Sequence, residues 1–156
     1  MANWVSAYYG FTLVKEVARN YLQHIGVQYS KHHVREIGIL QQKEEELIPF
    51  GKNLTCDTDL LNIIIWQLEK YGQYDEDFYL TWQNSKVDMY FLCVPDMPWE
   101  ADELRENPTD RDRLYNIYEE RLTLFAKPYI KLSGNMEQRQ SIIKQTMIEN
   151  RLNISE

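Results

Sequence analysis

Residues 53–71, NLTCDTDLLNIIIWQLEKY, join a short apolar run to a strongly apolar helical segment through a cluster of polar residues. The run Asn53–Cys56 predicts a buried strand, and Leu60–Tyr71 predicts a helix. Thr58 or Asp59 can cap this helix, because an oxygen on such a side chain accepts hydrogen bonds from the first-turn N–H groups. A strand that leads directly into a helix indicates an α/β fold.

The same alternation continues on both sides of this stretch. Further strands are expected at Phe11–Val14, Val87–Val94 and Pro128–Leu132, and further helices at Ala2–Tyr9, Lys15–Ile25, Lys31–Ile48, Glu76–Gln83, Arg113–Phe125 and Glu137–Leu152. Val87–Val94 is the most continuous apolar run, which predicts a strand covered on both faces. On the helix at Lys31–Ile48 the buried side is expected to carry Val34, Ile37, Ile39 and Leu40. The pattern predicts a parallel sheet in one α/β domain over residues 1–156.

Charge and length narrow the classes of function. The chain has 156 residues, and its 24 acidic residues against 17 Lys and Arg give a net charge of -7. This charge repels a polyanionic backbone, so no nucleic-acid partner is expected. No apolar run approaches the ~20 residues of a membrane span, and the first ten residues lack the pattern of a secretory signal. We therefore expect a cytoplasmic protein whose partner is a small molecule or a protein.

The two cysteines, Cys56 and Cys93, both lie inside short strand-forming runs. A thiol in such a run behaves as a small buried apolar group, which favours a reducing compartment. A catalytic thiol is the less favoured interpretation, because no histidine can be placed beside either cysteine from the sequence.

The string Cys56-Asp57-Thr58-Asp59 is the sharpest candidate site, because it follows a predicted strand directly. Ligands of parallel α/β sheets collect at the carboxyl ends of the strands. A carboxylate there can hold Mg²⁺ through water, or accept the proton of an attacking hydroxyl group. The alternative is simple helix capping by the acidic side chains, which the string alone favours.

A second candidate is the charged segment 99–113, which contains three arginines and six acidic residues. A guanidinium group on a closing lid can stabilise charge on a transferring phosphoryl group. The alternative is a solvated segment in which the arginines pair with the local acids, and composition alone slightly favours it.

Four strings, in this order, resemble successive blocks of the kinase domain of NadR-type nicotinamide riboside kinases. They are Lys15-Glu16-Val17-Ala18-Arg19-Asn20-Tyr21-Leu22, then Cys56-Asp57-Thr58-Asp59-Leu60-Leu61, then Val87-Asp88-Met89-Tyr90-Phe91-Leu92 with Pro98-Trp99-Glu100, and finally Lys127-Pro128-Tyr129-Ile130-Lys131-Leu132-Ser133-Gly134. The similarity extends over about Ala7 to Ile143. Each block is weak alone, and the ordered combination is specific.

The resemblance implies a P-loop α/β domain, with three layers, that phosphorylates nicotinamide riboside or a similar nucleoside with ATP and Mg²⁺. By the same resemblance, Glu16 and Arg19 bind the substrate. Asp57 and Asp59 are implied to be catalytic, with Asp57 also holding Mg²⁺ through water. The resemblance further implies a lid whose arginines bind phosphate, namely Arg105, Arg111 and Arg113. The chain departs from the family at Val17, where members commonly carry Tyr. Aromatic stacking on a nicotinamide ring is therefore not expected at that position.

The motif G-x-x-x-x-G-K-[ST], whose backbone N–H groups and Lys bind phosphate, does not occur in these 156 residues. The one Gly-Lys pair, Gly51-Lys52, precedes a predicted strand and is followed by Asn53. The resemblance implies that the loop and a central strand would come immediately before Met1, so that the domain begins inside a helix. We expect the chain as given to be inactive in phosphoryl transfer, the alternative function being a non-catalytic ligand-binding or regulatory module. Without the missing strand, the strands at Asn53 and Val87 would pair directly with each other, pair with a strand from another chain, or leave the domain marginally stable.

Overall fold

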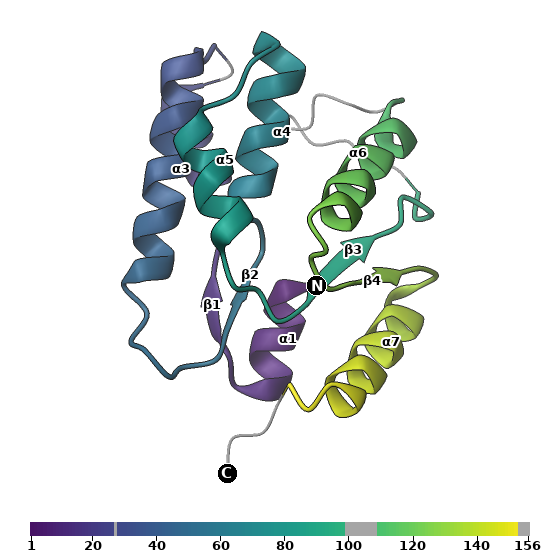
Figure 1. The fold of residues 1–156 in the computed structure, drawn as a ribbon. Helices are drawn as coiled ribbons and strands as arrows, with labels where there is room; N and C mark the ends of the chain where they lie inside the picture. Colours follow the sequence, from purple (N-terminus) through teal and green to yellow (C-terminus); the bar gives the residue numbers. More distant parts are fainter. Residues whose placement is uncertain (27, 99–108, 153–156) are drawn as a thin grey trace. The chain divides into compact units, whose positions relative to one another are not determined.

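The computed structural model describes residues 1–26, 28–98 and 109–152 (Figure 1). The chain divides into two compact units, Met1–Asn84 and Ser85–Glu156. Each unit contains one pair of strands together with helices. The expectation of one domain over residues 1–156 stays a prediction.

The first unit combines a short parallel pair of strands with five helices. Its elements are α1 (Ala2–Tyr9), β1 (Thr12–Val14), α2 (Val17–Ile25), α3 (Lys31–Glu46), β2 (Leu54–Cys56), α4 (Leu60–Tyr71) and α5 (Glu76–Asn84). β1 and β2 run parallel, with Thr12 opposite Leu54 and Val14 opposite Cys56. α3, α4 and α5 lie side by side, and α1 contacts both strands (Figure 1).

The core of the first unit lies between α3, α4 and α5. α4 buries apolar residues over most of its surface, as expected for a helix covered by neighbours on several sides. The fully buried or nearly buried apolar side chains of these helices are Val34, Ile37, Leu60, Leu61, Ile63, Ile64, Ile65, Phe78 and Trp82. Gly38 lies on the side of α3 that packs against this apolar cluster, where a methyl group would come within 2.5 Å of the Phe78 ring. The close approach of α3 to α5 therefore depends on the absence of a side chain at Gly38.

The second unit also combines parallel strands with helices. Its elements are β3 (Tyr90–Cys93), α6 (Arg111–Leu124), β4 (Tyr129–Leu132) and α7 (Met136–Glu149). β3 and β4 are parallel, with Tyr90 opposite Tyr129 and Cys93 opposite Leu132. Its buried apolar side chains include Leu122, Leu132, Ile143 and Met147.

Parallel strand pairing is confirmed within each unit, whereas one continuous sheet is not observed. The strands form two separate two-stranded sheets, and in the part of the chain that the structure describes β2 pairs with β1 alone and β3 with β4 alone. Each of these two strands keeps one edge without a partner strand. The central strand implied by the resemblance, and association through these edges, stay predictions.

The predicted burial of the strands is wrong in several places. Tyr90, Phe91 and Leu92 of β3 are only half-buried and Cys93 is exposed, while Leu54 of β2 is 42% exposed. The apolar sequence was sufficient to predict the strands, but burial also needs an element to cover each face. Leu40, expected on the buried side of α3, is 38% exposed, and the buried position next to it belongs to Gln41.

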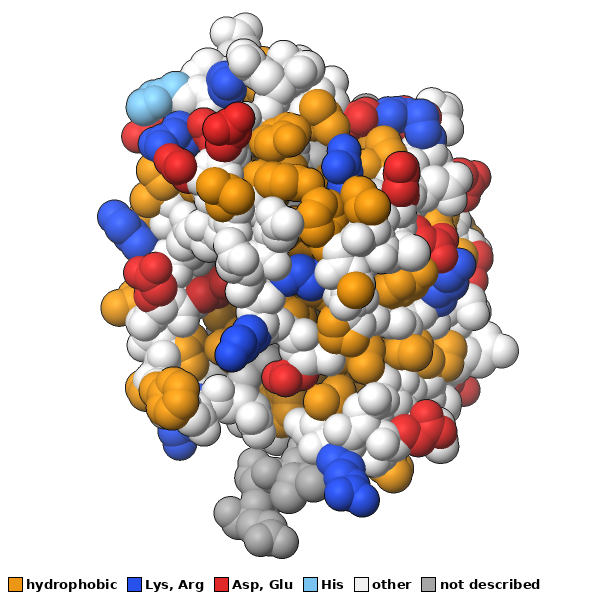
Figure 2. Space-filling model, in the orientation of Figure 1, with side chains coloured by type: hydrophobic (Ala, Val, Ile, Leu, Met, Phe, Trp, Pro, Cys, Tyr) orange, Lys and Arg blue, Asp and Glu red, His pale blue; other side chains and the backbone are white. Residues whose placement is uncertain are grey.

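The surface carries charges of both signs. On the face shown in Figure 2, Lys and Arg side chains lie spaced among acidic and apolar ones. Among the residues that the structure describes, no helix combines the length and the apolar composition needed to cross a membrane.

We predict that Gly38→Ala destabilises the protein. The added Cβ would lie 2.5 and 2.7 Å from two ring carbons of Phe78 and 3.2 Å from Ile63 Cγ2, and Phe78 is 3% exposed, so its ring cannot turn out into water. Overpacking typically costs about 1–3 kcal/mol, which exceeds the gain of up to about 1 kcal/mol in helix propensity. Urea denaturation should show a net loss of about 1–2 kcal/mol.

The control for this prediction is Glu44→Ala, an exposed position on the same helix, which should change the free energy of unfolding by no more than about 0.5 kcal/mol. A Gly38→Ala variant as stable as the unsubstituted protein would contradict the packing described for α3 and α5.

Candidate functional site

The carboxyl ends of β1 and β2 lie next to each other because the two strands are parallel and in register. Val14 is the register partner of Cys56, and the Asp57 N–H donates to the Val14 carbonyl at 3.0 Å, which extends the pairing beyond both strands. The chain leaves β1 toward Glu16 and leaves β2 toward Asp57. Two of the predicted site blocks therefore emerge at one edge of this sheet, where ligands of α/β folds bind.

Asp59 acts as the cap of α4. One oxygen of its side chain accepts a hydrogen bond from the Leu61 N–H at 2.9 Å, which satisfies a first-turn donor of the helix. The capping interpretation is thus confirmed for Asp59, and this bond fixes the end of the loop that carries Asp57. Asp57 itself is exposed.

Glu16 and Arg19 lie at the start of α2. Glu16 occupies the N-cap position, and its carboxylate lies 3.7 Å from the Arg19 Nε. The two side chains are 35% and 42% exposed, so their attraction is screened by water and contributes little to stability. Both side chains are therefore accessible at this edge of the sheet.

Gln41 of α3 joins the two blocks and was not among the residues predicted for the site. It is 1% exposed. Its Oε1 accepts from the Val17 N–H at 3.3 Å, and its Nε2 donates to the Thr58 carbonyl at 3.1 Å and to Glu45 Oε1 at 3.2 Å. One buried amide therefore contacts the start of α2, the loop after β2 and a carboxylate of its own helix. A polar residue on the buried side of an amphipathic helix was the signal that could have identified it.

The surroundings of Gln41 are acidic and partly desolvated. Burial raises the pKa of the Glu45 carboxyl, and the nearby charge of Asp59 adds to this, while the hydrogen bond from Gln41 opposes it. Burial likewise raises the pKa of the Cys56 thiol to about 12, with smaller contributions from Glu45 and Asp59. Cys56 is thus a neutral thiol at physiological pH, which argues against a nucleophilic role.

Asp57 offers an accessible carboxylate for a metal ion held through water. The described residues contain no group of three or more His, Cys, Asp or Glu that could hold a metal. Mg²⁺ commonly keeps several waters and uses one or two protein carboxylates together with substrate phosphates. An exposed Asp57 at the carboxyl end of a strand fits this mode, whereas Asp59 is already engaged by the helix.

The predicted lid arginines belong to the second unit. Arg105 and most of the segment 99–113 lie outside the described residues. Arg113 donates to Asp110 Oδ2 from Nε at 2.8 Å and from Nη2 at 2.7 Å, so local pairing with an acid is confirmed for this residue. Arg111 donates to the Met97 carbonyl at 2.8 Å, which holds the start of α6 near the end of the segment after β3.

A buried arginine orders the carboxyl ends of β3 and β4. Arg139 donates to the carbonyls of Gly134 and Val94, each at 2.8 Å, and forms an ion pair with Asp96. The Gly134 N–H also donates to Asp96 at 2.6 Å, and this bond, followed by the charge of Arg139, lowers the pKa of Asp96. These bonds tie the segments after β3 and β4 to the first turn of α7, so they stabilise this edge of the second sheet.

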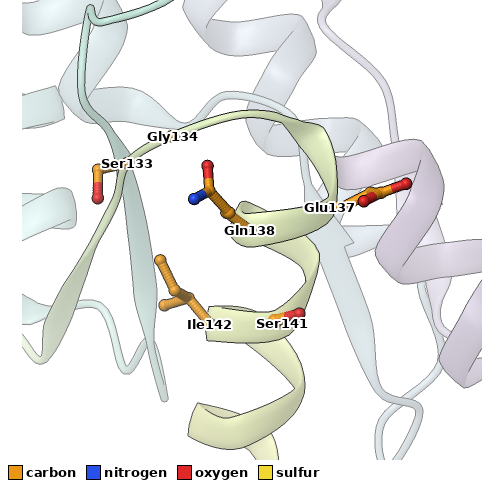
Figure 3. A pocket seen from close by; sticks show the side chains of 6 residues that line it. All are labelled: Ser133, Gly134, Glu137, Gln138, Ser141 and Ile142. Atoms are coloured by element: carbon orange, nitrogen blue, oxygen red, sulfur yellow. The ribbon is translucent and has the colours of Figure 1, made fainter.

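An open cavity of about 500 Å³ lies at the start of α7. Figure 3 shows Gln138 and Ile142 on the side of the helix that faces Ser133, while Glu137 points away. The side-chain oxygen of Gln138, Oε1, accepts from the Asn135 N–H at 2.8 Å, so the helix cap already uses it. One polar group of the cavity lining is therefore engaged by the helix cap.

A family model described as an AAA domain matches residues 1–139, which is most of the chain and spans both units up to the first turn of α7. No curated protein matches the chain.

We predict that the two cysteines differ in reactivity. Because the pKa of Cys56 is raised to about 12, almost none of it is thiolate at pH 8, whereas Cys93 is exposed. Iodoacetamide at pH 8 should alkylate Cys93 at least about tenfold faster than Cys56, as followed by peptide mass spectrometry. In denaturant the two rates should converge, and equal rates in the folded protein would contradict the environment described for Cys56.

Proposed function

The chain belongs to the AAA domain family of P-loop NTPases, and we propose that it carries the acceptor-substrate side of an ATP-dependent kinase or ATPase. The family is one of nucleotide-binding, ATPase-like domains. The proposed ligand is nicotinamide riboside or a similar nucleoside, as the resemblance of the four sequence blocks implies. The observation that carries the proposal is the convergence of two of those blocks at one edge of the β1–β2 sheet, with Gln41 between them.

In this proposal the position of each side chain determines its role. Asp57 is exposed at the carboxyl end of β2, where it can accept the proton of a substrate hydroxyl group as that group attacks phosphorus. Asp59 caps α4 and so holds the loop that presents Asp57. Glu16 and Arg19 are accessible at the neighbouring strand end and contact the nucleoside. The arginines of the lid, Arg105, Arg111 and Arg113, are proposed to neutralise phosphate charge.

Mg²⁺ and ATP are the cofactors that the family implies. Asp57 would hold Mg²⁺ through water, and the bound ion supplies neutralisation of the negative charge on the transferring phosphoryl group. The phosphate-binding motif G-x-x-x-x-G-K-[ST] does not occur within the 156 residues. We therefore propose that these residues by themselves bind a nucleoside and do not transfer phosphate.

The second candidate is a non-catalytic ligand-binding or regulatory module on the same fold. The cap formed by Asp59 favours it, because this side chain is already occupied in stabilising a helix. The two candidates differ in their dependence on Mg²⁺. A kinase-derived site should bind the nucleoside more tightly when Mg²⁺ is present at Asp57, whereas a simple binding module should not respond to the ion.

Isothermal titration calorimetry tests the proposal directly. Nicotinamide riboside should bind, Mg-ATP should give no saturable heat, and Asp57→Ala should weaken riboside binding about tenfold, equivalent to about 1.4 kcal/mol. The matched control is Asp77→Ala, an exposed carboxylate on α5 of the same unit, which should leave binding unchanged. Absence of riboside binding, or saturable Mg-ATP binding, would contradict the proposal.

A further inference from the structure

We propose that Gln41 is a positioning residue that holds the two halves of the acceptor site in register. The part of this proposal that concerns the ligand rests on the proposed function. The part that concerns the protein rests on the hydrogen bonds of the first unit. Neither the sequence blocks nor the family match assigns a role to this side chain.

The geometry of the Gln41 amide is the first observation. An amide offers two N–H donors and a carbonyl acceptor, and those of Gln41 are directed to two separate segments and to one carboxylate. The acceptor takes the Val17 N–H at 3.3 Å, and the donors reach Thr58 O at 3.1 Å and Glu45 Oε1 at 3.2 Å. No shorter or charged side chain can make this set of bonds, because it requires both donors and an acceptor on one group.

The start of α2 is the second observation. The first N–H groups of a helix have no partner within the helix, and the Glu16 side chain at the N-cap position makes no capping hydrogen bond. Gln41 supplies the missing acceptor to Val17 from a different helix. The orientation of the segment that carries Glu16 and Arg19 therefore depends on α3.

The loop after β2 is the third observation. The Thr58 carbonyl lies between Asp57 and Asp59, and it is held by the same amide. A displacement of Gln41 must therefore move both site segments together. Apolar packing could fill the same position, as neighbouring residues of α3 do, but it would leave the Val17 N–H and the Thr58 carbonyl without this link.

Hydrogen exchange of the full chain tests the link without any ligand. Gln41→Met keeps the volume of the side chain and removes its three hydrogen bonds. Protection should fall at least tenfold in two separate segments, residues 17–19 and 57–61, and stay unchanged in α5. The matched control is Gln67→Met, because Gln67 is also buried, at 0% exposure, and bridges to Asp75 elsewhere in the unit.

The control variant should spare both site segments. A Gln41→Met protein that loses protection in one segment only, or throughout the first unit in the manner of a general loss of stability, would overturn the proposal. This result is independent of nicotinamide riboside binding, so it separates failure of the positioning role from failure of the proposed function.

The pH dependence of riboside binding separates a positioning role of residue 41 from a purely structural one. In Gln41→Glu the new carboxylate can accept from Val17 at pH 8 but cannot donate to Thr58, whereas its protonated form can donate one bond. The titratable or charged groups on the segments bonded to Gln41 include Glu45 and Glu46 of α3, Cys56 of β2, Asp57 and Asp59 on either side of Thr58, and Glu16 with Arg19 at the start of α2. Most of these groups are acidic, and together with burial they favour the protonated form of the new carboxyl group. Riboside binding by Gln41→Glu should therefore recover in the mildly acidic range.

Nicotinamide riboside is the probe for this profile. Relative to the unsubstituted protein, Gln41→Glu should bind it about tenfold more weakly at pH 8 and recover most of that loss at pH 5, while Gln67→Glu should follow the unsubstituted protein at both values. A Gln41→Glu profile parallel to that of the unsubstituted protein would overturn the proposal.

Discussion

The parallel pairing of β1 with β2 is the constraint on which the first unit depends. Three residue pairs join the strands, and bonds from Thr12 to Asn53 and from Asp57 to Val14 extend the ladder at its two ends. Parallel strands require a long crossover, and here α2 and α3 form it. The crossover returns α3 against the carboxyl ends of the strands, where Gln41 meets the chain after β1 and after β2. The candidate site follows from this pairing, because neither block could lie beside the other if the strands were antiparallel.

The sequence predicted the elements of this arrangement better than their burial. The bounds of α4 and the cap at Asp59 follow from local chemistry, since an apolar periodic run after a capping residue specifies a helix whatever surrounds it. Gln41 could not be selected in this way. Periodicity assigned the buried position to Leu40, and only the path of α2 and of the loop after β2 shows why an amide is placed there instead.

In the second unit, too, the sequence predicted the strands better than their burial. The apolar run at β3 was sufficient to predict a strand parallel to β4, yet Cys93 is exposed and its neighbours are half-buried. An apolar run specifies which residues favour burial, but covering them requires elements on both faces and both edges. Among the described residues, β2 and β3 each pair with one strand, and association through their other edges stays a prediction.

The proposed function requires one nucleoside-like ligand to contact both segments at the carboxyl edge of β1 and β2. Chemical-shift mapping tests it most directly. On titration of nicotinamide riboside into the ¹⁵N-labelled chain, we expect saturable shifts of the backbone amides in residues 15–19 and 57–61 with one common dissociation constant. Shifts confined to one of these segments, shifts centred on the cavity at the start of α7, or no saturable shifts would contradict it.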